Sequence, residues 1–250
     1  MTEVPGTYYK YVIEMCGVNK FFGEHKVLKD ISLELSSDEN LVILGRSGTG
    51  KTVLIKCIAG LETYDSGEIY VMGNNIGEMD DFALNDLRKN IGFLFQGGAL
   101  YDSMTVEENL LFPLQRNARN LQEGEMSDLV DEVLVSVELI DAKYKMPQEL
   151  SGGMKKRAGL ARTLVLKPKV ILYDEPTTGL DPFTAQGISE LIVSVKERYK
   201  TASIVVTHDM KFARTTADRM IIMDQGQILA EGKYKELKMI ENEIIKGFFN

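Results

Sequence analysis

The sequence predicts an α/β protein built on a mixed, mainly parallel β-sheet. Short apolar strands recur along the chain, and each is followed by a polar or glycine-rich turn and then by helical periodicity. The strands that carry this prediction are residues 41–44, 91–95, 170–173 and 203–206. Open α/β sheets bind ligands at the carboxyl ends of their strands, where this chain places its unusual polar residues. The sequence therefore predicts a ligand site along one edge of the sheet.

The pattern changes between residues 97 and 145, where strands disappear. Apolar residues there follow helical spacing, at Leu129, Val133, Val137 and Ile140. We expect a helical lobe, residues 97–165, to be inserted into the sheet core. Residues 233–250 are expected to form a helical tail, and residues 1–250 together to form a single domain.

Composition limits the function classes. The chain has 250 residues, 44% hydrophobic and 26% charged, which suffices for a full core without disulfides. A formal net charge of −8 argues against a protein that tracks a nucleic-acid backbone, so no nucleic-acid partner is expected. Cys16 and Cys57 have no metal-ligand spacing and are expected to be buried, reduced thiols. The apolar runs are shorter than the ~18 residues of a membrane span, so the chain is not expected to cross a membrane.

The strongest single motif is "GRSGTGKT", which lies between an apolar strand and a helical run. It matches a phosphate-binding loop, in which backbone N–H groups cradle phosphates, Lys51 reaches the β- and γ-phosphates, and the Thr52 hydroxyl holds Mg²⁺. The alternative is a tight strand-to-helix turn that binds no nucleotide. The residues expected to bind nucleotide here are Gly45, Arg46, Ser47, Gly48, Thr49, Gly50, Lys51 and Thr52.

Two further segments suggest phosphate chemistry. "KVILYDEPTTGLDP" ends a buried strand with adjacent carboxylates; Asp174 would orient a metal ion through water, and Glu175 would polarise an attacking water. Alone, such a pair is more often a helix cap or a solvated turn. "LSGGMKKR" places Ser151, Gly152 and Gly153 before a predicted helix, whose positive N-terminal end favours anions. This second segment is half of a phosphate site whose other half lies elsewhere.

These motifs, with "GLDP" and His208 in the same order, resemble the ATP-binding cassette (ABC) ATPases over residues 15–232. The resemblance implies a P-loop NTPase core with ATP and Mg²⁺ as cofactors. It implies that Gln96 lies on a loop between the Mg²⁺ site and the helical lobe and serves both catalysis and metal binding. It also implies that Asp181 lies at a dimer seam and that His208 contacts the γ-phosphate; alone, His208 would be an ordinary histidine ending a core strand.

In that family the "LSGGM"-type segment closes over the nucleotide of a second copy, which implies a head-to-tail homodimer. Met154 stands where the commonest pattern has glutamine. Phe22 lies where the family places an aromatic residue that stacks on adenine. Because successive strand residues face opposite sides, one of Phe21 and Phe22 is expected in the core, and Phe22 is the better fit for stacking.

The run from Phe93 to Leu114, with "LSGGMKKRAGLAR", resembles the ATPases of Mla-type phospholipid transporters. That resemblance implies an integral membrane permease, a substrate-binding protein of the MCE class, phospholipid as substrate, and a peripheral position on the cytoplasmic face of the inner membrane. Leu100 and Val106 would alternatively pack inside the lobe. The tail resembles the ending of these ATPases, although a simple amphipathic helix explains it equally. Other importers, and a signalling or division complex that moves no solute, remain alternatives, as does a soluble cassette acting on ribosomes or DNA.

Overall fold

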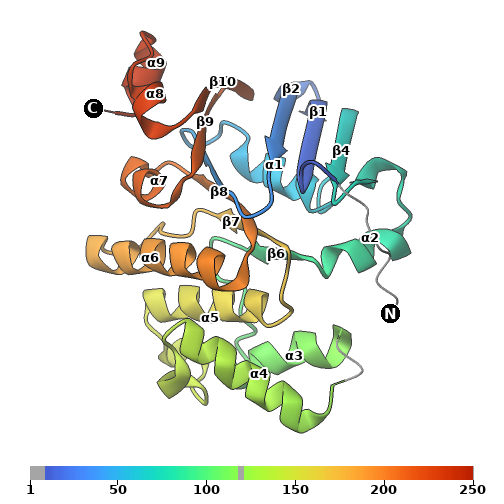
Figure 1. Ribbon diagram of the computed structural model, residues 1–250, viewed down its shortest axis with the longest axis vertical. Helices are drawn as coiled ribbons and strands as arrows, with labels where there is room; N and C mark the ends of the chain where they lie inside the picture. Colours follow the sequence, from blue (N-terminus) through green and yellow to red (C-terminus); the bar gives the residue numbers. More distant parts are fainter. Residues whose placement is uncertain (1–8, 118–120, 250) are drawn as a thin grey trace.

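The computed structural model describes residues 9–117 and 121–249; the remaining parts of the predicted domain, including residues 118–120 of the predicted lobe, lie outside them. A six-stranded sheet forms the centre (Figure 1), in the order β10 (Gln227–Gly232), β9 (Arg219–Asp224), β3 (Asn40–Leu44), β8 (Ala202–Thr207), β7 (Val170–Asp174) and β6 (Ile91–Leu94). Only the β9–β10 pair in this sheet is antiparallel. The prediction of a mixed, mainly parallel sheet is confirmed.

The central strands are apolar throughout because both of their faces are covered. Every residue of β3, β7 and β8 is buried. Along β3 the side chains alternate between two apolar cores: Leu41 and Ile43 lie in one, and Val42 and Leu44 in the other. Helices α6 (Pro182–Tyr199) and α7 (Met210–Thr216) contribute to the second of these cores. Continuous apolar runs were therefore a reliable signal for these strands.

A second, antiparallel sheet covers the other core and did not figure among the predicted strands. Its order is β2 (His25–Leu35), β1 (Ile13–Phe22), β4 (Ser66–Val71) and β5 (Asn74–Asn75). Helix α1 (Lys51–Ile58) packs beneath it and buries Cys57, whereas Cys16 on β1 is exposed. The expectation of two buried thiols is wrong for Cys16, because an antiparallel sheet presents one face to solvent. The short helices η1 (Ile76–Glu78) and α2 (Asp81–Arg88) follow this sheet.

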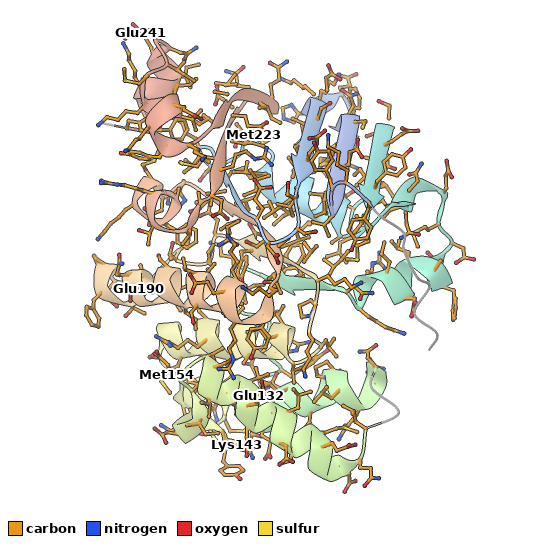
Figure 2. All side chains as sticks on the ribbon, in the orientation of Figure 1. Glu132, Lys143, Met154, Glu190, Met223 and Glu241 are labelled. Carbon is orange, nitrogen blue, oxygen red and sulfur yellow. The ribbon has the colours of Figure 1, made fainter. Side chains whose placement is uncertain are left out.

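Helices occupy the part of the chain predicted as a lobe, at the lower end of Figure 1. They are α3 (Val106–Asn117), α4 (Glu123–Ser136), η2 (Ile140–Ala142), η3 (Pro147–Glu149) and α5 (Gly152–Leu164). Lys143, labelled in Figure 2, joins α3 to α4, because its Nζ lies 3.2 Å from Glu107 Oε1 and 2.6 Å from Asp131 Oδ1. Within this group, helix α5 lies between α6 on one side and α3 and α4 on the other (Figure 1). The segment that contains Ser151 therefore starts a helix that touches both parts of the molecule.

The C-terminal segment is broken into two short helices, α8 (Tyr234–Lys238) and α9 (Glu243–Lys246). Asn242 starts the second helix, because its Oδ1 accepts hydrogen bonds from the backbone N–H groups of Ile244 and Ile245. The Phe249 ring meets the Tyr234 ring edge-on, with the centroids 5.3 Å apart. The tail thus folds back on itself, and the alternative of one simple amphipathic helix is wrong.

Asn109 fixes the loop that leads into α3. Its side chain is fully buried. Its Nδ2 donates to the carbonyls of Tyr101, Met104 and Thr105 at 2.9–3.1 Å, and its Oδ1 accepts from the Tyr101 N–H at 2.8 Å. One side chain therefore ties the loop from Tyr101 to Thr105 to the start of α3, in addition to the backbone hydrogen bonds from Met104 N–H to Tyr101 O and from Asn109 N–H to Thr105 O.

We predict that Asn109→Ala lowers the free energy of unfolding by about 2–3 kcal/mol, because buried loop groups lose their hydrogen bonds. Urea denaturation measures the change. Asn117→Ala is the control: Asn117 ends the same helix, is exposed, and donates a hydrogen bond to the Pro113 carbonyl. It should change stability by less than about 0.5 kcal/mol. Equal effects of the two substitutions would contradict this role for Asn109.

Candidate active site

The polar residues that end the central strands meet at one edge of the sheet. Two backbone hydrogen bonds extend the strand pairing beyond the strands: Gly45 N–H donates to Thr207 O at 3.2 Å, and Glu175 N–H donates to Val206 O at 2.9 Å. The glycine-rich loop after β3, the carboxylates after β7 and His208 after β8 are thereby held side by side. Strand β6 pairs with β7 in parallel, so Gln96 follows at the same edge.

A cleft of about 380 Å³ opens at this edge. Its walls include the predicted Ser47, Gly48, Gly50, Lys51, Thr52, Gln96, Glu175 and His208. Val27, Val53 and Thr178 also line the cleft and were missed. Val27 belongs to β2, and no sequence pattern predicted that this strand would lie beside the glycine-rich loop. Thr178 lies within the "DEPTTGLD" segment, and that proximity to Glu175 was the available signal.

The loop between β3 and α1 has the shape of an anion cradle. Gly48 and Gly50 have φ values of 80° and 98°, which favour glycine. A Cβ atom on Gly50 would lie 2.9 Å from Val27 O, whereas one on Gly48 would meet no atom within 4 Å and would point into open space. The Thr49 hydroxyl donates to Arg46 O at 2.9 Å and holds the turn. Helix α1 begins directly after this loop, and the N–H groups at a helix N-terminus favour an anion. The loop therefore fits a phosphate group.

Lys51 places a buried cation at the base of the cradle. Its Nζ donates to the carbonyls of Gly45 at 2.8 Å and Arg46 at 3.0 Å, and lies 3.6 Å from Glu175 Oε1. Burial lowers the pKa of Lys51, and the nearby Glu175 carboxylate opposes that shift. A phosphate in the cradle would supply a further partner for this ammonium.

Asp174 and Thr52 offer oxygen atoms of the kind that Mg²⁺ prefers. The Thr52 hydroxyl donates to Asp174 Oδ1 at 2.8 Å. Burial raises the pKa of Asp174, and the hydrogen bond from Thr52 opposes the shift. The described residues contain no cluster of three or more His, Cys, Asp or Glu side chains that could hold a metal ion. These residues fit Mg²⁺ that arrives with phosphate oxygens, because that ion takes few protein ligands.

Glu175 is held in an uncommon backbone conformation by several neighbours. Its φ is 47°, in the left-handed region that few non-glycine residues adopt. Its Oε2 lies 2.9 Å from His208 Nδ1, and accepts hydrogen bonds from the hydroxyls of Thr178 at 3.2 Å and Thr207 at 3.3 Å. The carboxylate therefore lies in the cleft beside Lys51.

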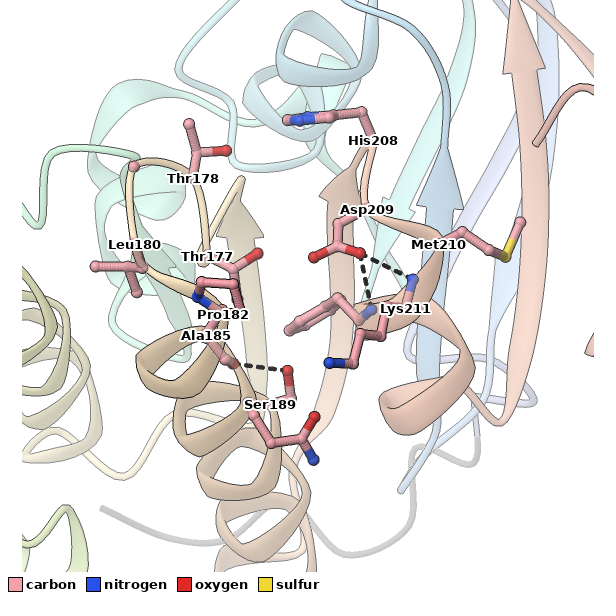
Figure 3. A pocket seen from close by; sticks show the side chains of 13 residues that line it. Thr177, Thr178, Leu180, Pro182, Ala185, Ser189, His208, Asp209, Met210 and Lys211 are labelled. Carbon is pink, nitrogen blue, oxygen red and sulfur yellow. Dashed lines mark hydrogen bonds between the residues drawn. The ribbon is translucent and has the colours of Figure 1, made fainter. Parts of the chain in front are cut away.

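A second cavity of about 570 Å³ adjoins the first and shares Thr178 and His208 with it. Figure 3 shows it between the start of α6 and the start of α7. Asp209 lies at its wall, where its Oδ1 accepts hydrogen bonds from the N–H groups of Lys211 at 2.8 Å and Phe212 at 3.1 Å. This capping fixes the turn that carries His208, whose side chain is 55% exposed. His208 thus has access to both cavities.

The remaining predicted residues lie elsewhere. The cleft lining does not include Ser151, Gly152, Gly153 or Asp181. Ser151 caps α5, because its Oγ accepts from the Met154 N–H at 3.3 Å; Met154 itself packs partly against the apolar core (Figure 2). A Cβ atom on Gly153 would lie 2.4 Å from Thr184 Cγ2, so this glycine also serves packing against α6.

Asp181 begins α6 in the same way that Ser151 begins α5. Its Oδ1 accepts from the N–H groups of Phe183 and Thr184, and its Oδ2 accepts from the Thr184 hydroxyl at 2.5 Å. The Thr184 hydroxyl bond is the main reason why the pKa of Asp181 is lowered. Both helix starts are therefore fixed by side-chain caps, and neither Ser151 nor Asp181 lines the cleft of its own chain.

Phe21 and Phe22 are both exposed, at 38% and 48%, so the expectation that one lies in the core is wrong. The pairing of β1 with β2 shifts register between Lys20 and Phe21, which breaks the alternation of strand faces near the hairpin turn. The Lys20 ammonium lies 4.8 Å from the centroid of the Phe22 ring and 2.8 Å from Glu62 Oε1. One face of the Phe22 ring therefore has a cation beside it.

Comparison with known proteins gives a consistent result. The family model described as "ABC transporter" matches residues 28–178. The chain is 38% identical to the probable ribonucleotide transport ATP-binding protein mkl of Mycobacterium leprae (strain TN), over 95% of this chain and 68% of that protein. It is 41% identical to the glutamine transport ATP-binding protein GlnQ of Geobacillus stearothermophilus, over 88% of this chain and 89% of that protein.

A solved structure shows the same arrangement. The ATP-binding cassette MJ0796, in a dimeric post-hydrolysis state bound to ADP and Pi, superposes with a TM-score of 0.80 and 33% identity, covering 88% of this chain and 98% of that one. Within residues 9–117 and 121–249, no helix is long and apolar enough to span a membrane. The cleft, the glycine-rich loop and the carboxylates at the sheet edge agree with these comparisons. The chain belongs to the ABC transporter family and is an ATPase that uses ATP and Mg²⁺.

Proposed function

We propose that two copies of this chain join head to tail and power a membrane permease that moves phospholipid between the membranes of the cell envelope. The observation that carries the dimer is that the cleft contains only half of the expected phosphate contacts. Ser151 and Gly152 are exposed at the start of α5 and lie outside the cleft of their own chain. A second copy in head-to-tail orientation would bring the same residues to the first copy's nucleotide.

An exposed aromatic side chain beside Asp181 supports this arrangement. Phe183, at the start of α6, is 89% exposed, so its ring is available for contact with a partner. In the proposed dimer, the segment from Asp181 to Phe183 faces the partner. The dimeric state of the MJ0796 cassette is consistent with this proposal.

In the proposed reaction, the residues of the cleft bind phosphate, hold Mg²⁺ or activate water. Lys51 and the loop N–H groups bind phosphate oxygens. Thr52, Asp174 and Gln96 would hold Mg²⁺, which neutralises phosphate charge when bound. Glu175 accepts a proton from the attacking water, and His208, 2.9 Å from Glu175, would contact the γ-phosphate. Phe22 is proposed to stack on adenine with the ring face that Lys20 does not occupy.

The proposed permease contact lies on the loop after Gln96. Tyr101 is 41% exposed and packs edge-on against Phe112, with the Arg162 guanidinium 4.6 Å from the centre of its ring. Val106 is fully buried and Leu100 packs partly against the core, as the alternative of internal packing predicted. Tyr101 is therefore the residue of this loop that we propose contacts the permease.

The phospholipid assignment rests on the resemblance of residues 93–114 and 150–162 to Mla-type ATPases. It includes an MCE-type protein bound through the permease and a peripheral site on the cytoplasmic face of the inner membrane. The relatives named above carry ribonucleotide and glutamine in their names, so the proposed substrate rests on the resemblance of these two segments and not on those relatives.

We predict that Glu175→Gln keeps ATP binding but lowers turnover roughly 100-fold or more, because the amide preserves the shape and loses the basic oxygen. Nucleotide binding by fluorescence and phosphate release measure the two properties separately. Glu190→Gln, on the exposed side of α6, is the matched control and should leave both unchanged. A fall in turnover of less than about tenfold would assign the base elsewhere.

The head-to-tail dimer is tested by complementation. Lys51→Ala and Ser151→Arg each damage both composite sites of a homodimer, whereas a mixture of the two chains yields heterodimers with one intact site and one doubly damaged site. We expect ATP-dependent dimers in the mixture and none in either pure variant, measured by sedimentation. A monomer that hydrolyses ATP at an unchanged specific rate over a wide dilution series would rule the dimer out.

Tyr101→Glu should release the ATPase from membranes while ATP binding is unchanged, because a carboxylate replaces the exposed ring at the proposed permease contact. Fractionation of membranes measures the release. Tyr144→Glu is the control, since Tyr144 is 72% exposed elsewhere on the helical lobe. The purified complex should exchange phospholipid between vesicles only with ATP. A permease without an MCE partner, or a complex that carries amino acids and no lipid, would contradict the substrate.

A further inference from the structure

Lys156 is a buried cation that the proposed chemistry does not use. It lies on α5, and only 6% of the residue is exposed. Its ammonium donates a hydrogen bond to the backbone carbonyl of Gln96, and a second one to the carbonyl of Glu175 at 3.4 Å. Burial lowers the pKa of Lys156, and the nearby carboxylates Asp174 and Glu175 oppose that shift. A lysine in such a place needs a structural or functional reason, because an unpaired buried ammonium is unfavourable.

The two carbonyls belong to the segments that matter most for catalysis. The Gln96 carbonyl is in the loop after β6, and the Glu175 carbonyl is in the residue with the left-handed backbone. The Glu175 carbonyl also accepts the N–H of Thr178 at 3.2 Å. Lys156 therefore supports the turn that directs the Glu175 carboxylate into the cleft, without touching the carboxylate itself.

Helix α5 and the loop after Gln96 are closely packed. A Cβ atom on Gly159 would lie 2.7 Å from Gly98 O, and one on Gly98 would lie 3.2 Å from Lys155 O. Arg162 donates a hydrogen bond to Ala99 O on the same loop. The helix and the loop have no room to slide past one another, so a displacement of α5 must carry the loop with it.

The same helix begins at the exposed Ser151 end. Residues 151 and 156 are separated by about one and a half turns, so a rigid α5 carries a displacement of its first turn directly to Lys156. At that end lie the groups that the proposed dimer places on the second copy's nucleotide. At Lys156 lie the Gln96 loop and the Glu175 turn of the same chain.

We propose that Lys156 is a positioning residue that links the nucleotide held by one copy to Glu175 of the other copy's chain. When the Ser151 end of α5 closes on the partner's nucleotide, Lys156 sets the Glu175 turn of its own chain in the orientation that activates water. The two sites then hydrolyse ATP cooperatively. This inference rests on the head-to-tail dimer proposed above.

The test compares three variants of the full chain. Lys156→Met keeps the length of the side chain and removes its donor and charge; Lys156→Gln restores a donor without charge. Lys155→Met is the control, since Lys155 is the half-exposed neighbour on the same helix. For Lys156→Met we expect kcat to fall about tenfold, KM to change less than about twofold, and the cooperativity of hydrolysis with ATP concentration to disappear. Lys156→Gln should recover much of the rate and the cooperativity, and the control should match the wild type.

Three results would overturn the inference. The first is unchanged kcat and cooperativity in Lys156→Met. The second is a loss of rate that leaves cooperativity intact, which indicates a structural role alone. The third applies if Lys156→Met does not fold: a further variant, Lys156→Ala, then shows wild-type cooperativity together with a tenfold lower rate. Sedimentation of the Glu175→Gln protein with ATP distinguishes failure of this inference from failure of the proposed dimer. If that protein remains a monomer with ATP, the proposed dimer is wrong. If it forms a dimer and one of the three results above is found, only the role of Lys156 is wrong.

Discussion

The pairing of β8 between β3 and β7 is the constraint on which the site depends. Hydrogen bonds from Gly45 N–H to Thr207 O and from Glu175 N–H to Val206 O continue the parallel ladders past the ends of the strands. They place the phosphate loop on one side of β8 and the carboxylates on the other. A shift of β7 by one residue would exchange the faces of Asp174 and Glu175, and would separate Asp174 from Thr52 and Glu175 from Lys51.

Much of this arrangement follows from the sequence because buried parallel strands are apolar without interruption. The four strands predicted at residues 41–44, 91–95, 170–173 and 203–206 all lie in the central sheet. The residues after them share one edge because the strands are parallel. The glycine-rich loop was equally predictable, because Gly48 and Gly50 adopt positive φ values that residues with a side chain disfavour.

The rest depends on contacts between distant parts of the chain. The antiparallel sheet has one solvent-exposed face, so its strands lack the continuous apolar signal. The register shift beside Phe21 is set by the pairing with β2, and a rule of strict alternation fails there. The break before α9 depends on how the tail folds back. The partners of Lys156 lie 60 and 19 positions away in sequence, a separation at which residue patterns carry no information.

Gly153 has a consequence for how defective alleles of this protein are understood. Its neighbour Thr184 leaves no space for a side chain, and α5 and α6 touch at this point. Gly153 is therefore constrained by the interior of a single subunit, in addition to the part that the proposed dimer gives it. A strain that carries a substitution there would lose the subunit to proteolysis as well as lose its activity. Ser151, whose side chain is exposed, lacks this packing constraint, so a substitution there costs the subunit only the cap of α5.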